Sequence, residues 1–283
     1  MTLAVDTKIK VEPIKPALGA VVHAAREDLL DKANVPFWLQ LLDQHVALVF
    51  PQVGLTDAEQ LAFTDLMGER INFSSQVPGG DEAAQDVYTI TLDTTINSEP
   101  EYVLGSMFWH GDGITSDIPP PKFTILSCHQ PPNKGGQTEF CNTMAAWDAL
   151  PEEEKEELRG LRVMHTLEAA VRDFMDPDEL NPARRHMRHE HPLVWTHADG
   201  RESLLLGSHA DYIVGWPKGQ GRALIVRLLE WCGQPAFTVR HTWSKGDLAI
   251  WDNCGSMHRA LPYSEDSGRK MHRTTVAGVE AIA

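Results

Sequence analysis

The sequence predicts a mainly β fold, a sandwich or jelly roll, with a few flanking helices. Short segments of alternating or wholly apolar character recur along the chain with turn residues between them, a pattern typical of two-sheet β proteins. The chain has 283 residues, a length at which all-β proteins commonly form one domain. It contains no repeat of fixed period and no low-complexity tract, which argues against a solenoid or a disordered array. We therefore expect residues 1–283 to form a single domain.

The helix candidates carry recognisable start and stop signals. The first has Pro36 near its start and apolar residues at helical spacing. In the second, Thr56 and Glu59 have the spacing of a capping box, and Gly68 is placed to end the helix. The third opens with a proline and three glutamates, which suit the positive end of a helix dipole. Helices are expected at residues 34–45, 56–69, 151–161 and 222–233.

Strand candidates dominate the rest of the chain. Residues 237–243, FTVRHTW, alternate along the chain in the period-two pattern of a half-buried strand. The remaining candidates are short and mostly apolar, with turn residues between them. They lie at residues 46–50, 122–128, 203–209, 247–253 and 273–279.

Two long polar connections, residues 72–105 and 172–192, interrupt this pattern. Long segments without periodicity in a compact enzyme often close over a ligand, although disorder is an alternative. We expect both segments to be candidate substrate covers. The stretch RRHMRHEH at residues 184–191 sets three histidines among arginines. A solvated basic loop is the expectation there, with closure over an anionic substrate as the alternative.

Charge and cysteine usage narrow the class of protein. The chain has 25 basic and 40 acidic residues and a net charge of −15. Such a charge repels nucleic acid and anionic lipid, so we expect neither nucleic acid nor membrane as a partner. The four cysteines lie far apart without CxxC pairing, which favours free thiols in a reducing compartment. The chain shows no secretory leader pattern and no long apolar run, so we expect a cytoplasmic protein.

The segment FWHGDG, residues 108–113, sets His110 and Asp112 one residue apart. On a strand, residues i and i+2 share a face, whereas on a helix they diverge. One metal ion is therefore held by both only from extended chain. The third ligand is best sought at His258, which follows an apolar strand and a turn of small residues. Two histidines and one carboxylate leave coordination positions open, an arrangement suited to non-haem Fe(II) and oxygen chemistry.

Two arginines near the C-terminus have a spacing that would place them together on one face of a strand. Arg269 and Arg273 are four residues apart, and on a strand an even separation puts both on one face. Two guanidinium groups beside a metal, in a protein of net negative charge, fit the recognition of carboxylates. The alternative is surface pairing with the abundant glutamates.

Several segments, in a fixed order, carry a family resemblance. They include WHGDG, PPNKGGQTEFCNTMAAWDALP, HPLVWTHADGRESLLLGSHA, FTVRHTWSKGDLAIWDN, MHRA and GRKMHRTTVAG. With the spacings 269 − 258 = 11 and 273 − 258 = 15, this set is far more specific than any single motif. The chain resembles, over nearly its whole length, the Fe(II)- and 2-oxoglutarate-dependent dioxygenases of the taurine dioxygenase and 2,4-dichlorophenoxyacetate dioxygenase type. The resemblance implies a double-stranded β-helix, or jelly roll.

The resemblance also assigns roles to residues. It implies that the three predicted metal ligands hold iron, and that Thr138 and Arg269 hold the distal carboxylate of 2-oxoglutarate. Arg273 matches the arginine that pairs with the acid group of the prime substrate, and Trp251 matches an aromatic residue beside the metal pocket. The implied reaction uses O2 and hydroxylates the prime substrate, with release of succinate and CO2. A homo-oligomer is common among such proteins.

The sequence allows more than one class of substrate. We expect a small anionic substrate, most simply a carboxylic acid such as an aryloxyalkanoate. The same chemistry on a sulfonate is an alternative, because Arg273 would pair with either anion. A metal-binding jelly-roll module without turnover is a further alternative, although a mere metal site has no use for Thr138 and Arg269. A hydrolytic zinc site is a weaker alternative, because it needs a general base beside the metal-bound water and no motif in the chain supplies one. The histidines expected in the core or beside the site, and not as ligands, are His165, His209, His241 and His272.

Overall fold

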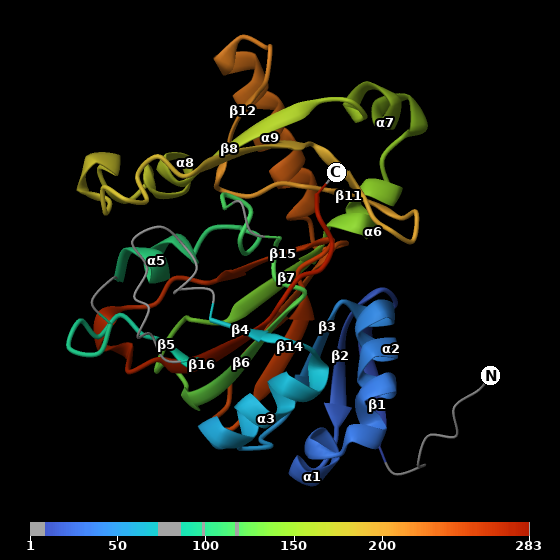
Figure 1. Cartoon of the computed structure of the whole chain (residues 1–283), viewed down its shortest axis with the longest axis vertical. Helices are drawn as coiled ribbons and strands as arrows, with labels where there is room; N and C mark the ends of the chain where they lie inside the picture. The colour runs from blue at the N-terminus through green and yellow to red at the C-terminus, as the bar shows by residue number, and fades with distance from the viewer. Residues whose placement is uncertain (1–8, 73–85, 98–99, 117–118, 283) are drawn as a thin grey trace.

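The computed structural model describes residues 9–72, 86–97, 100–116 and 119–282 of the chain. Two β-sheets form its centre, and helices cover the outer face of the larger one (Figure 1). In spatial order the larger sheet contains β1 (Lys10–Lys15), β2 (Leu18–His23), β3 (Ala47–Phe50), β14 (Leu248–Asp252), β6 (Phe123–Gln130), β16 (Lys270–Val276) and β4 (Arg70–Ile71), with β5 (Tyr88–Ile90) also paired to β16. The smaller sheet contains β13 (Thr238–His241), β7 (Thr138–Asn142) and β15 (Ser256–Ala260).

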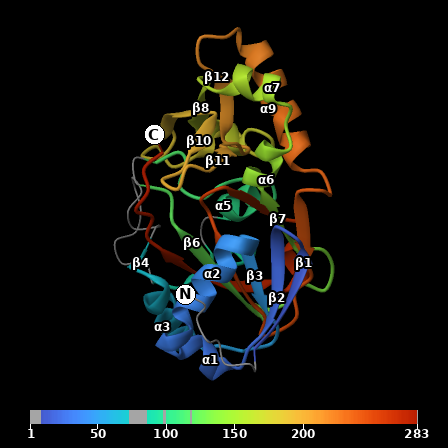
Figure 2. The ribbon, with the colours of Figure 1, turned by 90° about the vertical axis from the view of Figure 1, so that its right-hand side faces the viewer.

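Further elements extend the molecule beyond the two central sheets. Figure 2 shows helices at one end and a layer of strands with a long helix at the other. The helices on the larger sheet are α1 (Arg26–Leu30), α2 (Val35–His45) and α3 (Asp57–Met67). The opposite end holds α6 (Thr143–Asp148), α7 (Glu152–Leu158), α8 (Leu167–Val171) and α9 (Lys218–Cys232), the sheet of β12 (Ala210–Ile213), β8 (Arg162–Thr166) and β9 (Arg188–Pro192), and the pair β10 (Val194–Thr196) and β11 (Glu202–Leu204). The helix α5 (Pro100–Gly105) and short 3₁₀ turns at Lys32–Asn34, Pro177–Glu179 and Glu265–Ser267 complete the described elements.

Strand β14 shows how alternation builds two separate cores. Leu248 and Ile250 belong to the cluster beneath α2 and α3, whereas Ala249 and Trp251 belong to the cluster between the two sheets. Successive side chains of a strand point to opposite faces, so one strand serves both cores. Because both faces are covered, β14 reads as a continuous apolar run and not as an alternating one.

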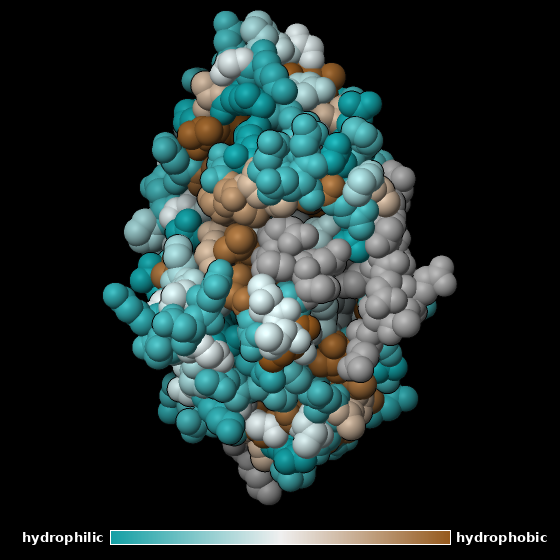
Figure 3. All heavy atoms as spheres, turned by 90° about the vertical axis from the view of Figure 1, so that its left-hand side faces the viewer, coloured by the Kyte–Doolittle hydropathy of each residue, from teal (hydrophilic) through white to brown (hydrophobic). Residues whose placement is uncertain are grey.

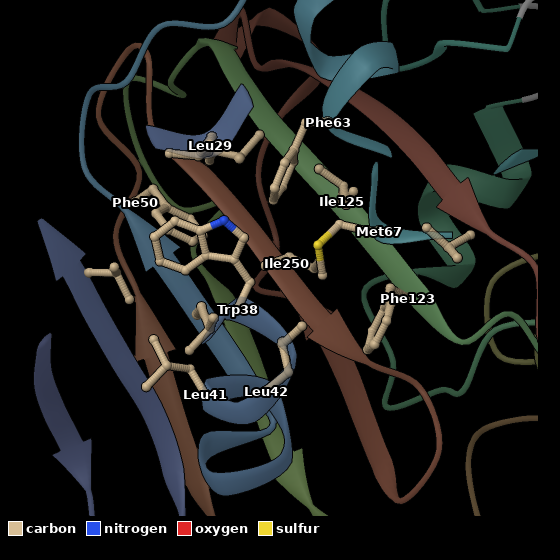
Figure 4. Packing of buried hydrophobic residues seen from close by; sticks show 14 of the residues in the cluster. Leu29, Trp38, Leu41, Leu42, Phe50, Phe63, Met67, Phe123, Ile125 and Ile250 are labelled. Carbon is tan, nitrogen blue, oxygen red and sulfur yellow. The ribbon is translucent and has the colours of Figure 1, made fainter. Parts of the chain in front are cut away.

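The outer core is rich in aromatic side chains. In Figure 4, Trp38, Leu41 and Leu42 pack from α2, and Phe63 and Met67 pack from α3, over the labelled residues of the sheet. Trp38 meets Phe50 edge to face at a centroid distance of 5.4 Å, a geometry that aromatic pairs prefer. This layer fixes the helices to the larger sheet.

The predicted helices are present, with small shifts at their ends. The capping box of α3 is confirmed, because the Thr56 N–H donates to Glu59 Oε2 at 2.9 Å and the Glu59 N–H donates to Thr56 Oγ1 at 3.4 Å. The last helix begins at Lys218, earlier than predicted, because Pro217 supplies its start. No helix in the described part of the chain has the length and apolar character needed to cross a membrane.

The two predicted covers have different outcomes. Residues 73–85 and 98–99 of the first lie outside the described residues, and the rest of it includes β5 and α5. The second ends in β9, which pairs with β8. The solvated loop predicted for residues 184–191 is therefore wrong for residues 188–191. His191, on β9, is buried, and its Nε2 lies 3.0 Å from the carbonyl oxygen of Ile114. The surface in Figure 3 is largely hydrophilic, with apolar side chains gathered near the middle of that face.

The packing of Trp38 provides a test of the outer core. Its side chain is fully buried, and truncation of a buried tryptophan costs about 3–5 kcal/mol. We expect Trp38→Ala to lower the free energy of unfolding by this amount in urea denaturation. The adjacent Leu39 is 39% exposed, so Leu39→Ala should change it by less than about 0.5 kcal/mol. Equal effects of the two substitutions would contradict this packing.

Candidate active site

The central residues of the site are brought together by one short backbone pairing. His110 forms an isolated β-bridge with His258 on β15. The His110 N–H donates to the His258 carbonyl at 3.1 Å, and the His258 N–H donates to the His110 carbonyl at 2.9 Å. The chain at His110 is therefore extended, as the next-but-one spacing to Asp112 predicts. Asp112 follows in the turn that begins directly after this bridge.

The three predicted ligands face one another. The Nε2 atoms of His110 and His258 each lie 3.9 Å from Oδ1 of Asp112, and the two imidazole rings are 4.2 Å apart. One ligand atom from each of the three lies within 4.8 Å of the other two. Two imidazoles and one carboxylate at this spacing can hold one divalent transition metal from a single side.

Hydrogen bonds leave the correct atoms free for a metal. His110 Nδ1 lies 2.8 Å from the carbonyl oxygen of Phe108. A carbonyl only accepts, so Nδ1 carries the proton and Nε2 keeps its lone pair for a metal. The ring of Trp251 packs against that of His258 at a centroid distance of 4.7 Å. Trp251 thus lies beside the three ligands.

A chain of side chains holds the other oxygen of Asp112. The Thr124 hydroxyl donates to Asp112 Oδ2 at 2.8 Å, and it accepts a hydrogen bond from the Asn253 amide at 2.9 Å. The amide oxygen of Asn253 in turn accepts from the Trp251 indole N–H at 3.0 Å. This chain fixes the carboxylate and leaves Oδ1 directed at the two histidines. Sequence reasoning missed Thr124 and Asn253, because both resemble ordinary residues of a buried strand and a turn.

The protonation states of the ligands suit metal binding. Burial opposes ionisation of Asp112, yet its electrostatic interactions with His258, Arg273 and His110 and the hydrogen bond from Thr124 lower its pKa to about 2. Burial, followed by the proximity of His110, lowers the pKa of His258 to about 3. At neutral pH the carboxylate is therefore ionised and His258 is neutral, which are the forms that bind a metal.

Arg269 and Thr138 were both predicted to bind 2-oxoglutarate, and both are buried. The Arg269 side chain is almost fully buried, its Nε donates to the Gly136 carbonyl at 3.2 Å, and its guanidinium lies 4.8 Å from the centre of the Tyr263 ring. Burial lowers the pKa of Arg269, although an arginine stays charged. Among the described residues Arg269 makes no ion pair with a carboxylate. A buried cation without a counter-ion is costly, so the site calls for an anion.

The Thr138 hydroxyl has a proton that it can donate to such an anion. Thr138 is buried, and its Oγ1 accepts a hydrogen bond from the Trp243 indole N–H at 2.9 Å. The hydroxyl proton therefore remains available for a ligand. Gly136 lies two residues earlier with φ +66°, and a Cβ there would lie 3.0 Å from Cδ of Arg269. Glycine lets the backbone approach the guanidinium closely.

Arg273 lies beside the predicted metal ligand Asp112. Its Nη1 is 4.0 Å from Asp112 Oδ1, and its side chain is 24% exposed. The guanidinium also lies over the ring of Tyr88 at 5.1 Å. Arg269 lies directly before β16, whereas Arg273 lies on that strand, two residues after the buried Met271. The partial exposure of Arg273 leaves it accessible to an incoming anion.

Two histidines predicted to lie beside the site support the ligand segment. His209 Nε2 accepts a hydrogen bond of 3.3 Å from the N–H of Gly111, the residue between His110 and Asp112. His209 Nδ1 lies 2.7 Å from His165 Nδ1, and both side chains are buried. Burial, followed by the proximity of His110, lowers the pKa of His209 to about 3. His209 is therefore a neutral hydrogen-bonding group that fixes the backbone of the ligand segment.

Comparison with known proteins identifies the family. The sequence model of the family described as "Taurine catabolism dioxygenase TauD, TfdA family" matches residues 10–275. The chain belongs to this family. It is 33% identical, over 92% of its length and 91% of the relative's, to the alpha-ketoglutarate-dependent 2,4-dichlorophenoxyacetate dioxygenase of Burkholderia sp. (strain RASC). It is 30% identical, over 96% and 90% of the two chains, to the alpha-ketoglutarate-dependent sulfate ester dioxygenase of Pseudomonas putida.

A solved structure agrees in fold with this TauD/TfdA family member. The crystal structure of AAD-2 in complex with Mn(II) and N-oxalylglycine superposes with a TM-score of 0.81. The sequence identity is 29%, and the match covers 98% of this chain and 100% of that one. The predicted double-stranded β-helix with flanking helices is confirmed. The protein is an Fe(II)- and 2-oxoglutarate-dependent dioxygenase, which uses Fe(II), 2-oxoglutarate and O2.

The hydrogen bond from Thr124 to Asp112 provides a test of the ligand geometry. We expect Thr124→Val to weaken Mn(II) binding about 10–100-fold in equilibrium dialysis, the usual effect of losing a partner of a metal ligand. Thr143 is also buried, but its hydroxyl has no hydrogen-bond partner among the described residues. Thr143→Val should leave the Mn(II) affinity unchanged, and an unchanged affinity in Thr124→Val would refute the role of Thr124.

Proposed function

We propose that His110, Asp112 and His258 bind the catalytic Fe(II) of this dioxygenase. Their donor set, their mutual distances and the protonation states of Asp112 and His258 support this assignment. The hydrogen bonds at His110 Nδ1 and Asp112 Oδ2 further support it, because they orient the remaining ligand atoms.

We propose that Arg269 and Thr138 bind the distal carboxylate of 2-oxoglutarate. The guanidinium supplies the counter-charge, and the Thr138 hydroxyl donates a hydrogen bond, its oxygen being already held by Trp243. In a buried position this charge-assisted contact gains strength from the low local dielectric. The buried guanidinium of Arg269, which has no carboxylate partner in the described part of the chain, is the observation that supports this assignment most strongly.

We propose that the prime substrate is a small carboxylic acid, such as an aryloxyalkanoate, held through its acid group by Arg273. The observation that carries this proposal is the position of Arg273, which is close to Asp112 yet partly exposed. A substrate anion at Arg273 would lie beside the metal ligands. The name of the Burkholderia relative supports an aryloxyacetate as one member of the class.

A sulfonate or a sulfate ester is the second candidate class. A guanidinium group also binds sulfur oxyanions through paired hydrogen bonds, and the relative from Pseudomonas putida is a sulfate ester dioxygenase. The position of Arg273 fits both classes equally. The module without turnover is not supported, because the chain belongs to a family of dioxygenases.

The protein's own residues position the substrate and exclude water from the site. When bound, Fe(II) with 2-oxoglutarate and O2 supplies the oxidant for hydroxylation of a C–H bond, with release of succinate and CO2. Arg273 holds the acid end of the substrate, so that the adjacent C–H bonds face the metal ligands. Trp251, packed on His258 and on Phe140, excludes water from one side of the site.

We further propose that residues 1–283 form one catalytic domain. The family match over residues 10–275 spans both central sheets and supports this organisation. The cytoplasmic location, the homo-oligomer and the absence of nucleic-acid and membrane partners stay predictions from the sequence.

Removal of the carboxylate ligand tests the metal assignment. We expect Asp112→Ala to abolish substrate-dependent succinate formation, because the metal loses its only charged protein ligand. Asp43→Ala, which removes an exposed carboxylate paired with Arg201, should retain full turnover. Normal turnover in Asp112→Ala would contradict the assignment.

Removal of the Arg273 guanidinium tests the substrate assignment. A charge-assisted hydrogen bond contributes about 1.5–3 kcal/mol, so we expect Arg273→Ala to lower kcat/KM for phenoxyacetate about 10–150-fold. The KM for 2-oxoglutarate should change much less. In Arg269→Ala we expect the reverse, with a larger effect on the KM for 2-oxoglutarate than on kcat/KM for phenoxyacetate. Phenoxyacetamide, which lacks the anion, should be a poor substrate of wild type and little affected by Arg273→Ala.

The same assay separates the two substrate classes. Steady-state rates of wild type with phenoxyacetate, an alkyl sulfonate and an alkyl sulfate ester identify the preferred anion. If Arg273→Ala weakened the use of 2-oxoglutarate as strongly as that of the substrate, the separate roles of the two arginines would be refuted.

A further inference from the structure

A second group of metal-binding side chains lies outside the active site. Within the described residues, two groups of three histidine or acidic side chains have a geometry suited to a metal ion: the ligands described above, and Asp57, His129 and His272. The second group joins the start of α3 to the strands β6 and β16. From the sequence, His272 was expected in the core or beside the active site; it lies instead on the opposite face of β16 from Arg273.

The fold places these side chains together through a bulge. Met271 pairs with Cys128 and Lys270 pairs with Gln130, so His129 is the extra residue of β6 at an irregularity in the register. Bulges redirect side chains locally. The His129 ring stacks on the His272 ring at a centroid distance of 3.6 Å and an interplanar angle of 23°. Both rings lie on the side of the sheet that α3 covers.

The ligand atoms have a separation close to that in a metal site. His272 Nδ1 lies 2.7 Å from Asp57 Oδ1, and His129 Nε2 lies 3.6 Å from the same oxygen. In a tetrahedral site with bonds of about 2.0–2.1 Å, ligand atoms are about 3.3 Å apart. The two distances to Asp57 Oδ1 lie on either side of this value, and all three ligand atoms lie within 4.8 Å of one another.

An independent observation favours a ligand at this place. His129 Nε2 is shielded from solvent and makes no hydrogen bond among the described residues, because 3.6 Å to Asp57 is too long for one. A buried nitrogen without a partner is costly, and a metal ion would satisfy it. A simple pair between Asp57 and His272 does not explain this nitrogen.

We propose that Asp57, His129 and His272 form a second site for a divalent metal ion such as Zn²⁺. Two imidazoles and one carboxylate suit borderline ions, with water in the fourth position. The ion would cross-link the first turn of α3, the bulge of β6 and β16. Its role would be structural: the ion would hold in place β16, the strand whose other face carries Arg273. Lys245 and Lys270 act electrostatically on His129 and oppose a cation, so the affinity should be modest.

Metal stoichiometry in paired variants tests the proposal. The metal-free full-length protein is dialysed against Zn(II) at neutral pH, and bound zinc is measured by elemental analysis. In an Asp112→Ala background, which removes one of the three active-site ligands and so weakens metal binding there, we expect one equivalent of zinc. In Asp112→Ala/His129→Gln we expect none. Zinc should raise the Tm of the first protein and leave that of the second unchanged, because binding to the native state stabilises it.

The controls separate this site from adventitious binding and from the active site. His23 is an exposed histidine 3.2 Å from Glu12, so His23→Ala in the same background should still bind one equivalent. Asp57→Asn replaces His129→Gln if that variant fails to fold. Zinc bound equally with and without His129, or no zinc in Asp112→Ala, would overturn the proposal. The difference between wild type and Asp112→Ala reports on the active-site ligands alone, so the two assignments fail independently.

Discussion

The antiparallel pairing of β6 with β14 and β16 determines where the chemistry takes place. In this register Thr124 lies opposite Trp251 on one side and Thr275 on the other. A slip of one residue would turn every side chain of a strand to the wrong face. Because apolar side chains cover both faces of β14 and β6, such a slip would expose two cores at once. Packing therefore holds the polar side chains of the site in register.

Within this frame, the site concentrates buried charge in a protein of net charge −15. Asp112 is ionised at the centre of the site, and Arg269 is buried without a carboxylate partner among the described residues. The folded protein bears the cost of desolvating both groups before any ligand arrives. A metal ion and a dicarboxylate would compensate these charges, so binding energy goes into ordering the reactants and not into rearranging the protein.

Much of this arrangement follows from the sequence, but its supporting contacts do not. The next-but-one spacing of His110 and Asp112 predicts extended chain at His110, which the structure has. The even separation of Arg269 and Arg273 predicts one shared strand face, but Arg269 lies just before β16. The roles of Thr138 and Arg269 follow only from the family resemblance. Thr124 carries no sequence signal, because a threonine in an apolar strand looks like any other buried residue. His129 likewise depends on a bulge, which is a property of two paired strands and not of either one alone.

The proposed site binds a metal at His110, Asp112 and His258 and 2-oxoglutarate at Arg269 and Thr138. Anaerobic titration of the Fe(II)-loaded protein with 2-oxoglutarate, followed by visible absorption spectroscopy, measures both at once. We expect a weak charge-transfer band that saturates at one 2-oxoglutarate per iron and does not form with succinate. The absence of a band, in protein shown to contain one Fe(II) per chain, would contradict this assignment.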